Sequence, residues 1–149
     1  MPEKQTIAAA RKAKREGKSP STQAGAFVHE EIEHIRDGKH GAHSAKQAIA
    51  IGLSKARRAG VKLPAPPKSA SKRTKQAAKR DSARAGKTTK PSPARSKAAK
   101  EALADEPKAA ASSRALSRQA TAAAKRRPAS ARKASARKAA RTRARRSDS

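Results

Sequence analysis

The large apolar side chains of this sequence are confined almost entirely to its first 63 residues. Of thirteen Met, Ile, Val, Leu and Phe residues in the 149-residue chain, eleven precede position 64, and Leu103 and Leu116 are the other two. Burial of such side chains is the main favourable term in folding, so a hydrophobic core can form only near the N-terminus. We therefore expect two parts, a folded module at residues 1–63 and a tail at residues 64–149.

Charge divides the chain at the same point. Lys and Arg outnumber Asp and Glu by 13 to 6 in residues 1–63 and by 26 to 5 in residues 64–149. A segment with so much net charge and so little apolar surface cannot offset the conformational entropy lost on folding. We predict that residues 64–149 are an intrinsically disordered, basic tail. Ala, Lys and Arg have high helix propensity, but the repulsion between the cations opposes helix until their charge is neutralised. Helices in the free tail should therefore be transient.

Residues 44–60, SAKQAIAIGLSKARRAG, carry the signals of one complete helix. Ser44 and Gln47 have the S-x-x-Q spacing of a capping box, in which the hydroxyl accepts a hydrogen bond from the third helical amide. Gly60 can adopt the left-handed conformation that ends many helices. Gly52, in the middle, costs about 1 kcal/mol relative to Ala. We therefore expect another element to pack tightly against Gly52.

A second helix is predicted to run from Ser21 or Thr22 to about Asp37, with Gly38 as its stop. The connection at residues 38–43 is short enough for the two helices to lie antiparallel. We expect their apolar faces to meet. The residues predicted to form the shared core are Phe27, Ile32, Ile49 and Leu53.

The predicted fold class is mainly α. A mostly solvated helix from Glu3 to Glu16 can lie across the hairpin, which gives a helical hairpin or a three-helix module followed by the disordered tail. A core below about 70 residues rarely supplies enough stability alone, so we expect a homodimer or stabilisation by a partner. No segment approaches the ~18 apolar residues of a membrane span or a signal-peptide apolar run, which predicts a cytoplasmic location.

The run KQAIAIGLSKARRAG resembles the signature of a small, uncharacterised bacterial domain family, usually KQAIAIALSEARRAG and often labelled DNA-binding. The likeness covers roughly Met1 to Leu63, with Gly52 where Ala is usual and Lys55 where Glu is usual. The tail, with its repeated ASARK, resembles linker histones and Lys/Ala-rich bacterial histone-like proteins. These resemblances imply association with DNA and supply no catalytic residues.

The charge of the tail predicts its partner class. A polycation gains free energy by releasing phosphate counterions, so we expect binding to the backbone of duplex DNA without sequence preference. RNA is the alternative, although Phe27 is the only aromatic residue available to stack on splayed bases. Membrane binding is not expected, because the tail lacks an apolar anchor. The tail residues predicted to contact nucleic acid are Lys72, Arg73, Lys125, Arg126, Arg127, Arg132, Lys133, Arg137, Lys138, Arg141, Arg143, Arg145 and Arg146.

Cations at the end of the helix at residues 44–60 are predicted to add phosphate contacts. They are Lys55, Arg57, Arg58 and Lys62. A helix-turn-helix with this helix as the recognition helix is less well supported. The six-residue connection exceeds the usual turn of about 3–4 residues, and the middle of the helix is apolar.

The histidines predict no metal or catalytic site. His29 and His34 are five residues apart rather than at the H-E-x-x-H spacing, so they point to different faces of a helix. Glu31 and His34 match the E-x-x-H of di-iron bundles, which need a second copy and further Glu ligands. We expect His29, His34, His40 and His43 to be solvated, the neighbouring acids to pair with the basic first helix, and the protein to need no cofactor.

The sequence contains no cysteine and no assembled pair of nucleophile and base, so we expect no enzymatic activity. The function predicted from it is non-specific DNA binding, in which a histone-like tail compacts or coats DNA in the nucleoid. The alternative is an adaptor, whose helical module docks a protein partner while the tail tethers it to RNA or ribosomes.

Overall fold

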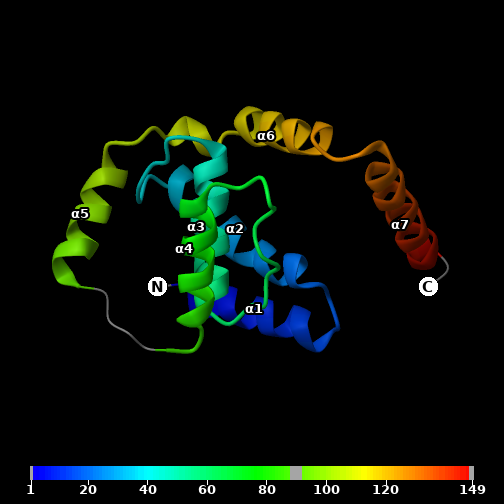
Figure 1. Ribbon diagram of the computed structural model, residues 1–149, viewed down its shortest axis with the longest axis horizontal. Helices are drawn as coiled ribbons and strands as arrows, with labels where there is room; N and C mark the ends of the chain where they lie inside the picture. The colour runs from blue at the N-terminus through cyan, green and yellow to red at the C-terminus, as the bar shows by residue number, and fades with distance from the viewer. Residues whose placement is uncertain (1, 88–91, 148–149) are drawn as a thin grey trace. The chain divides into compact units, whose positions relative to one another are not determined.

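The computed structural model describes residues 2–87 and 92–147. In these residues, helices are the only regular secondary structure. The helices are α1 (Lys4–Arg15), α2 (Pro20–Arg36), α3 (Ala45–Arg58), α4 (Lys72–Ala83), α5 (Pro93–Ala104), the short 3-10 helix η1 (Lys108–Ala111), α6 (Ser113–Lys125) and α7 (Ala129–Ser147) (Figure 1). Two compact units divide the chain, Met1–Ser112 and Ser113–Ser149. The boundary between these units lies between η1 and α6 in the sequence.

Helix α3 begins and ends where its sequence signals predict. The Ser44 hydroxyl accepts a hydrogen bond from the Gln47 amide at 3.2 Å, and Gly60 has a φ of 92°. The Gln47 side chain reaches back one residue further than a capping box requires, because its Oε1 accepts from the His43 amide at 2.9 Å. The predicted cap and stop of α3 are confirmed.

Helix α2 begins slightly earlier than predicted. The residue that caps it is Ser19, whose Oγ accepts from the Thr22 amide at 3.4 Å, and Pro20 occupies the first helical position. Proline is well suited there, because its fixed φ is already helical and the first amide needs no intrahelical acceptor. The stop at Gly38, with a φ of 76°, is confirmed.

Helices α2 and α3 pack against each other as an antiparallel pair, and α1 packs on α2 (Figure 1). One core cluster joins Ala24 and Phe27 of α2 to Ala56, near the end of α3. The other joins Ile35, near the end of α2, to Ala48, near the start of α3. The early part of each helix thus meets the late part of the other, as the short connection predicted.

The core contains smaller side chains than predicted. Phe27 is fully buried, whereas Ile32 and Leu53 only pack against the clusters from partly exposed positions, and Ile49 belongs to neither cluster. The buried face of α3 consists of Ala45, Ala48, Gly52 and Ala56. The large apolar residues of α3 therefore flank the helix interface, and the small residues allow the two backbones to approach closely.

Gly52 lies at the closest approach of α2 and α3. A Cβ at this position would lie 2.7 Å from Val28 Cα and 3.0 Å from the Phe27 carbonyl oxygen. Both are backbone atoms, so the clash could be relieved only by moving the helices apart. The expected tight packing at Gly52 is confirmed.

Replacing Gly52 with Ala is expected to destabilise the protein although Ala favours helix. Overpacking costs about 1–3 kcal/mol, against a gain in helix propensity of about 1 kcal/mol, so we expect a net loss of up to about 2 kcal/mol. Gly25→Ala is the matched control, because a Cβ there meets nothing within 4 Å and its helix is α2. Urea unfolding should show Gly25→Ala stabilised and Gly52→Ala destabilised; equal stabilisation would contradict the close approach.

The predicted disorder of residues 64–149 is not supported where the structure describes them, because α4 to α7 are helical, while residues 88–91 and 148–149 lie outside the described residues. These helices are favoured by local sequence features that a count of large apolar residues does not include. Ala, Lys and Arg have high helix propensity, the Ser71 hydroxyl caps α4 by accepting from the Thr74 amide at 3.1 Å, and Pro93 starts α5 at its first turn. Proline suits this position, because its fixed φ is already helical.

Two segments beyond residue 63 also pack on the N-terminal helices. Ala78 of α4 is buried, and the Ser54 hydroxyl donates to Asp81 Oδ2 at 2.5 Å. Ala110 and Ala111 of η1 are buried in the same cluster as Ile35. Alanines and one aspartate therefore attach these segments without any large apolar residue.

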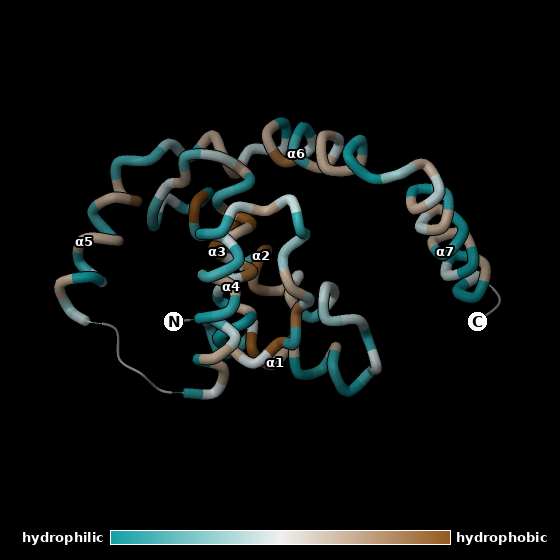
Figure 2. Tube along the Cα trace, viewed as in Figure 1, coloured by the Kyte–Doolittle hydropathy of each residue, from teal (hydrophilic) through white to brown (hydrophobic). Residues whose placement is uncertain are grey.

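Apolar residues gather in α2 and α3, whereas α7 shows only the weak apolar colour of its alanines among polar residues (Figure 2). Among the residues that the structure describes, no helix combines the length and the apolar character needed to cross a bilayer.

Candidate functional site

The most basic part of the described chain is its last helix. Helix α7 has eight Lys and Arg residues among its 19 and no acidic residue. None of its residues is buried, and the same holds for α6. The predicted nucleic-acid contacts of this unit are all exposed: Lys125, Arg126, Arg127, Arg132, Lys133, Arg137, Lys138, Arg141, Arg143, Arg145 and Arg146.

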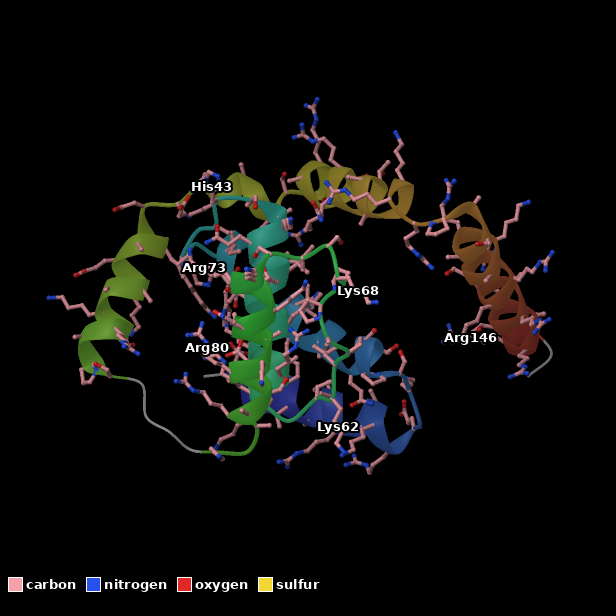
Figure 3. All side chains as sticks on the ribbon, viewed as in Figure 1. His43, Lys62, Lys68, Arg73, Arg80 and Arg146 are labelled. Carbon is pink, nitrogen blue, oxygen red and sulfur yellow. The ribbon has the colours of Figure 1, made fainter. Side chains whose placement is uncertain are left out.

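The cations of α7 surround the helix. The ASARK repeat places basic pairs at residues 132–133 and 137–138, five residues apart. Five residues exceed one turn of 3.6, so each successive pair is rotated around the axis. The helix consequently has no apolar stripe with which to pack on a protein core. Arg146 projects from its end (Figure 3).

A second basic surface lies on α4. The predicted contacts Lys72 and Arg73 are exposed there, and Lys62 is exposed on the segment that follows α3. Arg73 and Arg80, seven residues apart, extend from the same side of α4 (Figure 3). This surface is also positively charged, but α4 contains one acid, Asp81.

The predicted contacts near the end of α3 are held by neighbouring groups. Arg58 Nε lies 3.6 Å from Asp81 Oδ1, and Arg57 donates from Nη2 to the Pro64 carbonyl at 3.2 Å. Asp81 therefore offsets part of the positive charge that Arg58 would offer to phosphate.

Lys55 lies apart from the other predicted phosphate contacts, because its ammonium turns inward. Its Nζ is 2.5 Å from Glu31 Oε2 and 3.8 Å from Glu30 Oε1, and its side chain is 18% exposed. The Glu31 side chain is only 1% exposed. Glu30 and Glu31 thus pair with α3, and Glu33 pairs with Arg36 of α2 itself, rather than with the basic first helix as predicted.

Histidines complete this buried cluster. His40 Nε2 lies 3.1 Å from Glu31 Oε1, and His34 Nε2 lies 3.1 Å from Glu3 Oε1. The hydrogen bond from His34, followed by the charge of Lys39, holds the pKa of Glu3 below its usual value. The cluster joins α2, α3 and the residue before α1, and it holds these elements together.

The prediction of solvated histidines is right for two of the four. His29 and His43 are exposed, but the side chains of His34 and His40 are only 15% and 18% exposed. The E-x-x-H spacing of Glu31 and His34 was the one signal that could have identified the cluster. His40 gave no such signal, because its position depends on how the connection folds back.

The comparisons match only the N-terminal part of the chain. The profile of DUF6496, described as a family of unknown function, matches residues 27–69. This range contains most of α2, all of α3 and the buried residues Glu31 and Lys55. Comparison with curated proteins and with solved structures gives no match. The N-terminal part is therefore similar to an uncharacterised small domain whose description names no DNA-binding function.

Proposed function

We propose that the protein binds nucleic acid, with duplex DNA as the main partner, through the exposed basic helices α6 and α7. The observation that carries the proposal is the composition and exposure of α7, which has cations on every side and no acid. The exposed cations of α4 and Lys62 would add phosphate contacts.

Backbone contacts account for the affinity in this proposal. Duplex DNA carries one negative charge per about 1.7 Å of axis, and each neutralised phosphate releases counterions. Helix α7, at about 1.5 Å per residue, extends over many such charges. Base readout needs a fixed set of side chains on the face that enters a groove. The Lys and Arg residues of α7 are instead distributed around the helix, and α7 contains no Asn, Gln, Asp or Glu to read adenine or cytosine. Binding should therefore depend little on sequence.

Cations on opposite sides of α7 support a coating or compacting role. A helix with one basic face neutralises one duplex, whereas a helix with cations all around can contact two duplex segments at once. Bridging of this kind brings DNA segments together, which is the histone-like activity that the tail composition predicts. A nucleoid location follows from this proposal.

An adaptor is the second candidate. The matched range 27–69 and the buried cluster belong to the unit Met1–Ser112, whereas α6 and α7 belong to the other unit. In this proposal the helical module docks a protein partner or a second copy of the chain, while the basic helices tether it to RNA or ribosomes. Capture of partners with the full chain, with and without nuclease, distinguishes the two candidates.

Binding should be indifferent to DNA sequence. Fluorescence anisotropy with a labelled duplex and a scrambled duplex of equal length is expected to give equal affinities, because phosphates supply the contacts. A mismatched base pair in a specific site costs about 1–3 kcal/mol, so discrimination of that size would contradict the proposal. A single-stranded RNA of the same length serves as the comparison for the adaptor, and tighter binding to it would favour tethering to RNA.

A further inference from the structure

Glu31, His34 and His40 bring one carboxylate and two imidazoles together. Each offers one ligand atom, and these atoms all lie within 4.8 Å of one another. Glu31 Oε1 and His40 Nε2 lie 3.1 Å apart. Tetrahedral metal bonds of about 2.0–2.2 Å place ligand atoms about 3.3–3.6 Å apart, so this pair needs to separate by only a few tenths of an ångström to bind one ion.

The fold explains how three residues from one short stretch meet. Glu31 and His34 are three residues apart on α2 and share a face of the helix. The left-handed turn at Gly38, with a φ of 76°, reverses the chain after α2. His40 follows two residues later, and its ring returns to the side chain of Glu31.

The hydrogen bonding of His40 leaves a place for a cation. Its Nδ1 lies 2.9 Å from the Gly41 carbonyl oxygen, which can only accept, so Nδ1 carries the hydrogen. In the neutral ring, Nε2 then directs a lone pair at Glu31 Oε1, and two acceptors face each other. A backbone carbonyl on the far nitrogen is also the usual arrangement that orients a metal-binding histidine.

Glu31 is a buried carboxylate that its neighbours do not fully satisfy. Neither of its oxygens accepts a well-aligned hydrogen bond from the described residues, although Lys55 forms an ion pair with Oε2. Leaving a buried charge without hydrogen bonds is costly. The second oxygen, Oε1, faces His40 rather than Lys55. One side of this carboxylate is thus neutralised by Lys55 and the other is available to an ion.

We propose that Glu31, His34 and His40 bind a divalent transition-metal ion of the zinc class. Two imidazoles and one carboxylate favour such an ion over Mg²⁺ or Ca²⁺, which prefer oxygen ligands. Glu3, whose Oε1 is 3.1 Å from His34 Nε2, is the nearest group that could become a fourth ligand. His34 and Glu3 also line an open depression beside α2, which gives the ion a path from solvent.

Binding of a metal ion would stabilise the conformation of the connection between α2 and α3. This connection also contacts the end of α5, because Gly41 donates from its amide to the Leu103 carbonyl at 2.8 Å. Ala42 likewise donates to the Pro107 carbonyl at 3.3 Å. A metal at His40 would therefore stabilise the attachment of residues 103–111 to the N-terminal helices.

Zinc binding to the full-length protein tests the proposal. Competition with a chromophoric chelator should show one Zn²⁺ per chain, and Co²⁺ should give the visible absorption of a site with nitrogen and oxygen ligands. His40→Ala and Glu31→Gln should each weaken Zn²⁺ binding at least about 100-fold. Removing a residue that only supports a metal ligand weakens binding by about 10–100-fold, so a larger loss identifies a direct ligand. His43→Ala is the matched control, because its side chain is 81% exposed, and it should leave the affinity unchanged.

A second measurement keeps the test independent of how well the variants fold. Zn²⁺ should slow hydrogen exchange at the amides of Gly41 and Ala42 in the unmodified chain. Absence of Zn²⁺ binding to the unmodified chain would overturn the proposal and leave His40 only as a polar neighbour of Glu31. Equal weakening by His43→Ala and His40→Ala would also overturn it, because the ion would then be bound by surface histidines.

Discussion

Truncation after Ser112 is expected to weaken binding to duplex DNA by about 10³-fold or more at low salt. The deletion removes 13 of the 39 Lys and Arg residues and only one acid, and it ends the chain at the boundary between the two compact units. A protein that makes 6–10 phosphate contacts owes so much of its affinity to them that raising salt from about 50 to 200 mM lowers it by about 10³–10⁵. Anisotropy with one labelled duplex measures the difference.

The control for this truncation keeps the charge of the removed segment and changes the order of its residues. A chain in which residues 113–147 are scrambled retains every cation and should bind DNA as the native sequence does. If the scrambled chain bound DNA as weakly as the truncated chain, a specific arrangement of side chains on α6 or α7 would be responsible for the affinity. Retention of most of the affinity by the truncated chain would instead assign binding to the surfaces of α4 and α3.

Replacing Lys55 with Met is expected to destabilise the protein by about 3–5 kcal/mol. The change leaves Glu31, whose side chain is 1% exposed, without its nearest cation. An uncompensated buried charge costs more than the ion pair contributes, so the loss should be large. Urea unfolding in the presence of a chelator measures it without any contribution from bound metal.

Two variants show whether the loss comes from the ion pair. Lys46→Met removes a lysine from an exposed position on the same helix and should change stability by less than about 0.5 kcal/mol. Combining Lys55→Met with Glu31→Leu removes both charges and should recover much of the stability. Equal stability of Lys55→Met and Lys46→Met would show that the buried ion pair does not support the fold.

Local signals made α3 the most predictable part of the fold. The Ser44 cap, the Gly60 stop and the tight packing at Gly52 each depend on a few neighbouring residues or on the simple cost of glycine in a helix. The contribution of Ile49 to the core was overestimated. The size of a side chain does not reveal whether a helix interface places it at the centre or at the edge.

The packing of the described segments beyond residue 63 could not be derived from their apolar content. Ala110 and Ala111 are buried in the core cluster with Ile35, although alanine was not counted among the large apolar residues. The Ser54–Asp81 hydrogen bond joins positions 27 residues apart in the sequence. Such contacts depend on the path of the chain, whereas the helices themselves could have been anticipated from Ala, Lys and Arg propensity.

The exposed cations of α7 could be predicted from the sequence, whereas the cluster around Glu31 could not. The exposed cations of α7 follow directly from composition, because a helix without an apolar stripe cannot bury them. The pairing of Lys55 with Glu31 and the return of His40 are tertiary, and no spacing in the sequence specifies them. Lys55 was therefore grouped with the surface cations that follow it, Arg57 and Arg58.

The salt dependence of DNA binding tests the central claim most directly. Each neutralised phosphate contributes about −0.9 to the slope of log K against log salt concentration on duplex DNA. We expect a steep slope for the full-length protein and for the charge-preserving scramble of residues 113–147, and a slope flatter by several units for the chain that ends at Ser112. Equal slopes for the full-length and truncated chains would contradict binding through the basic helices α6 and α7.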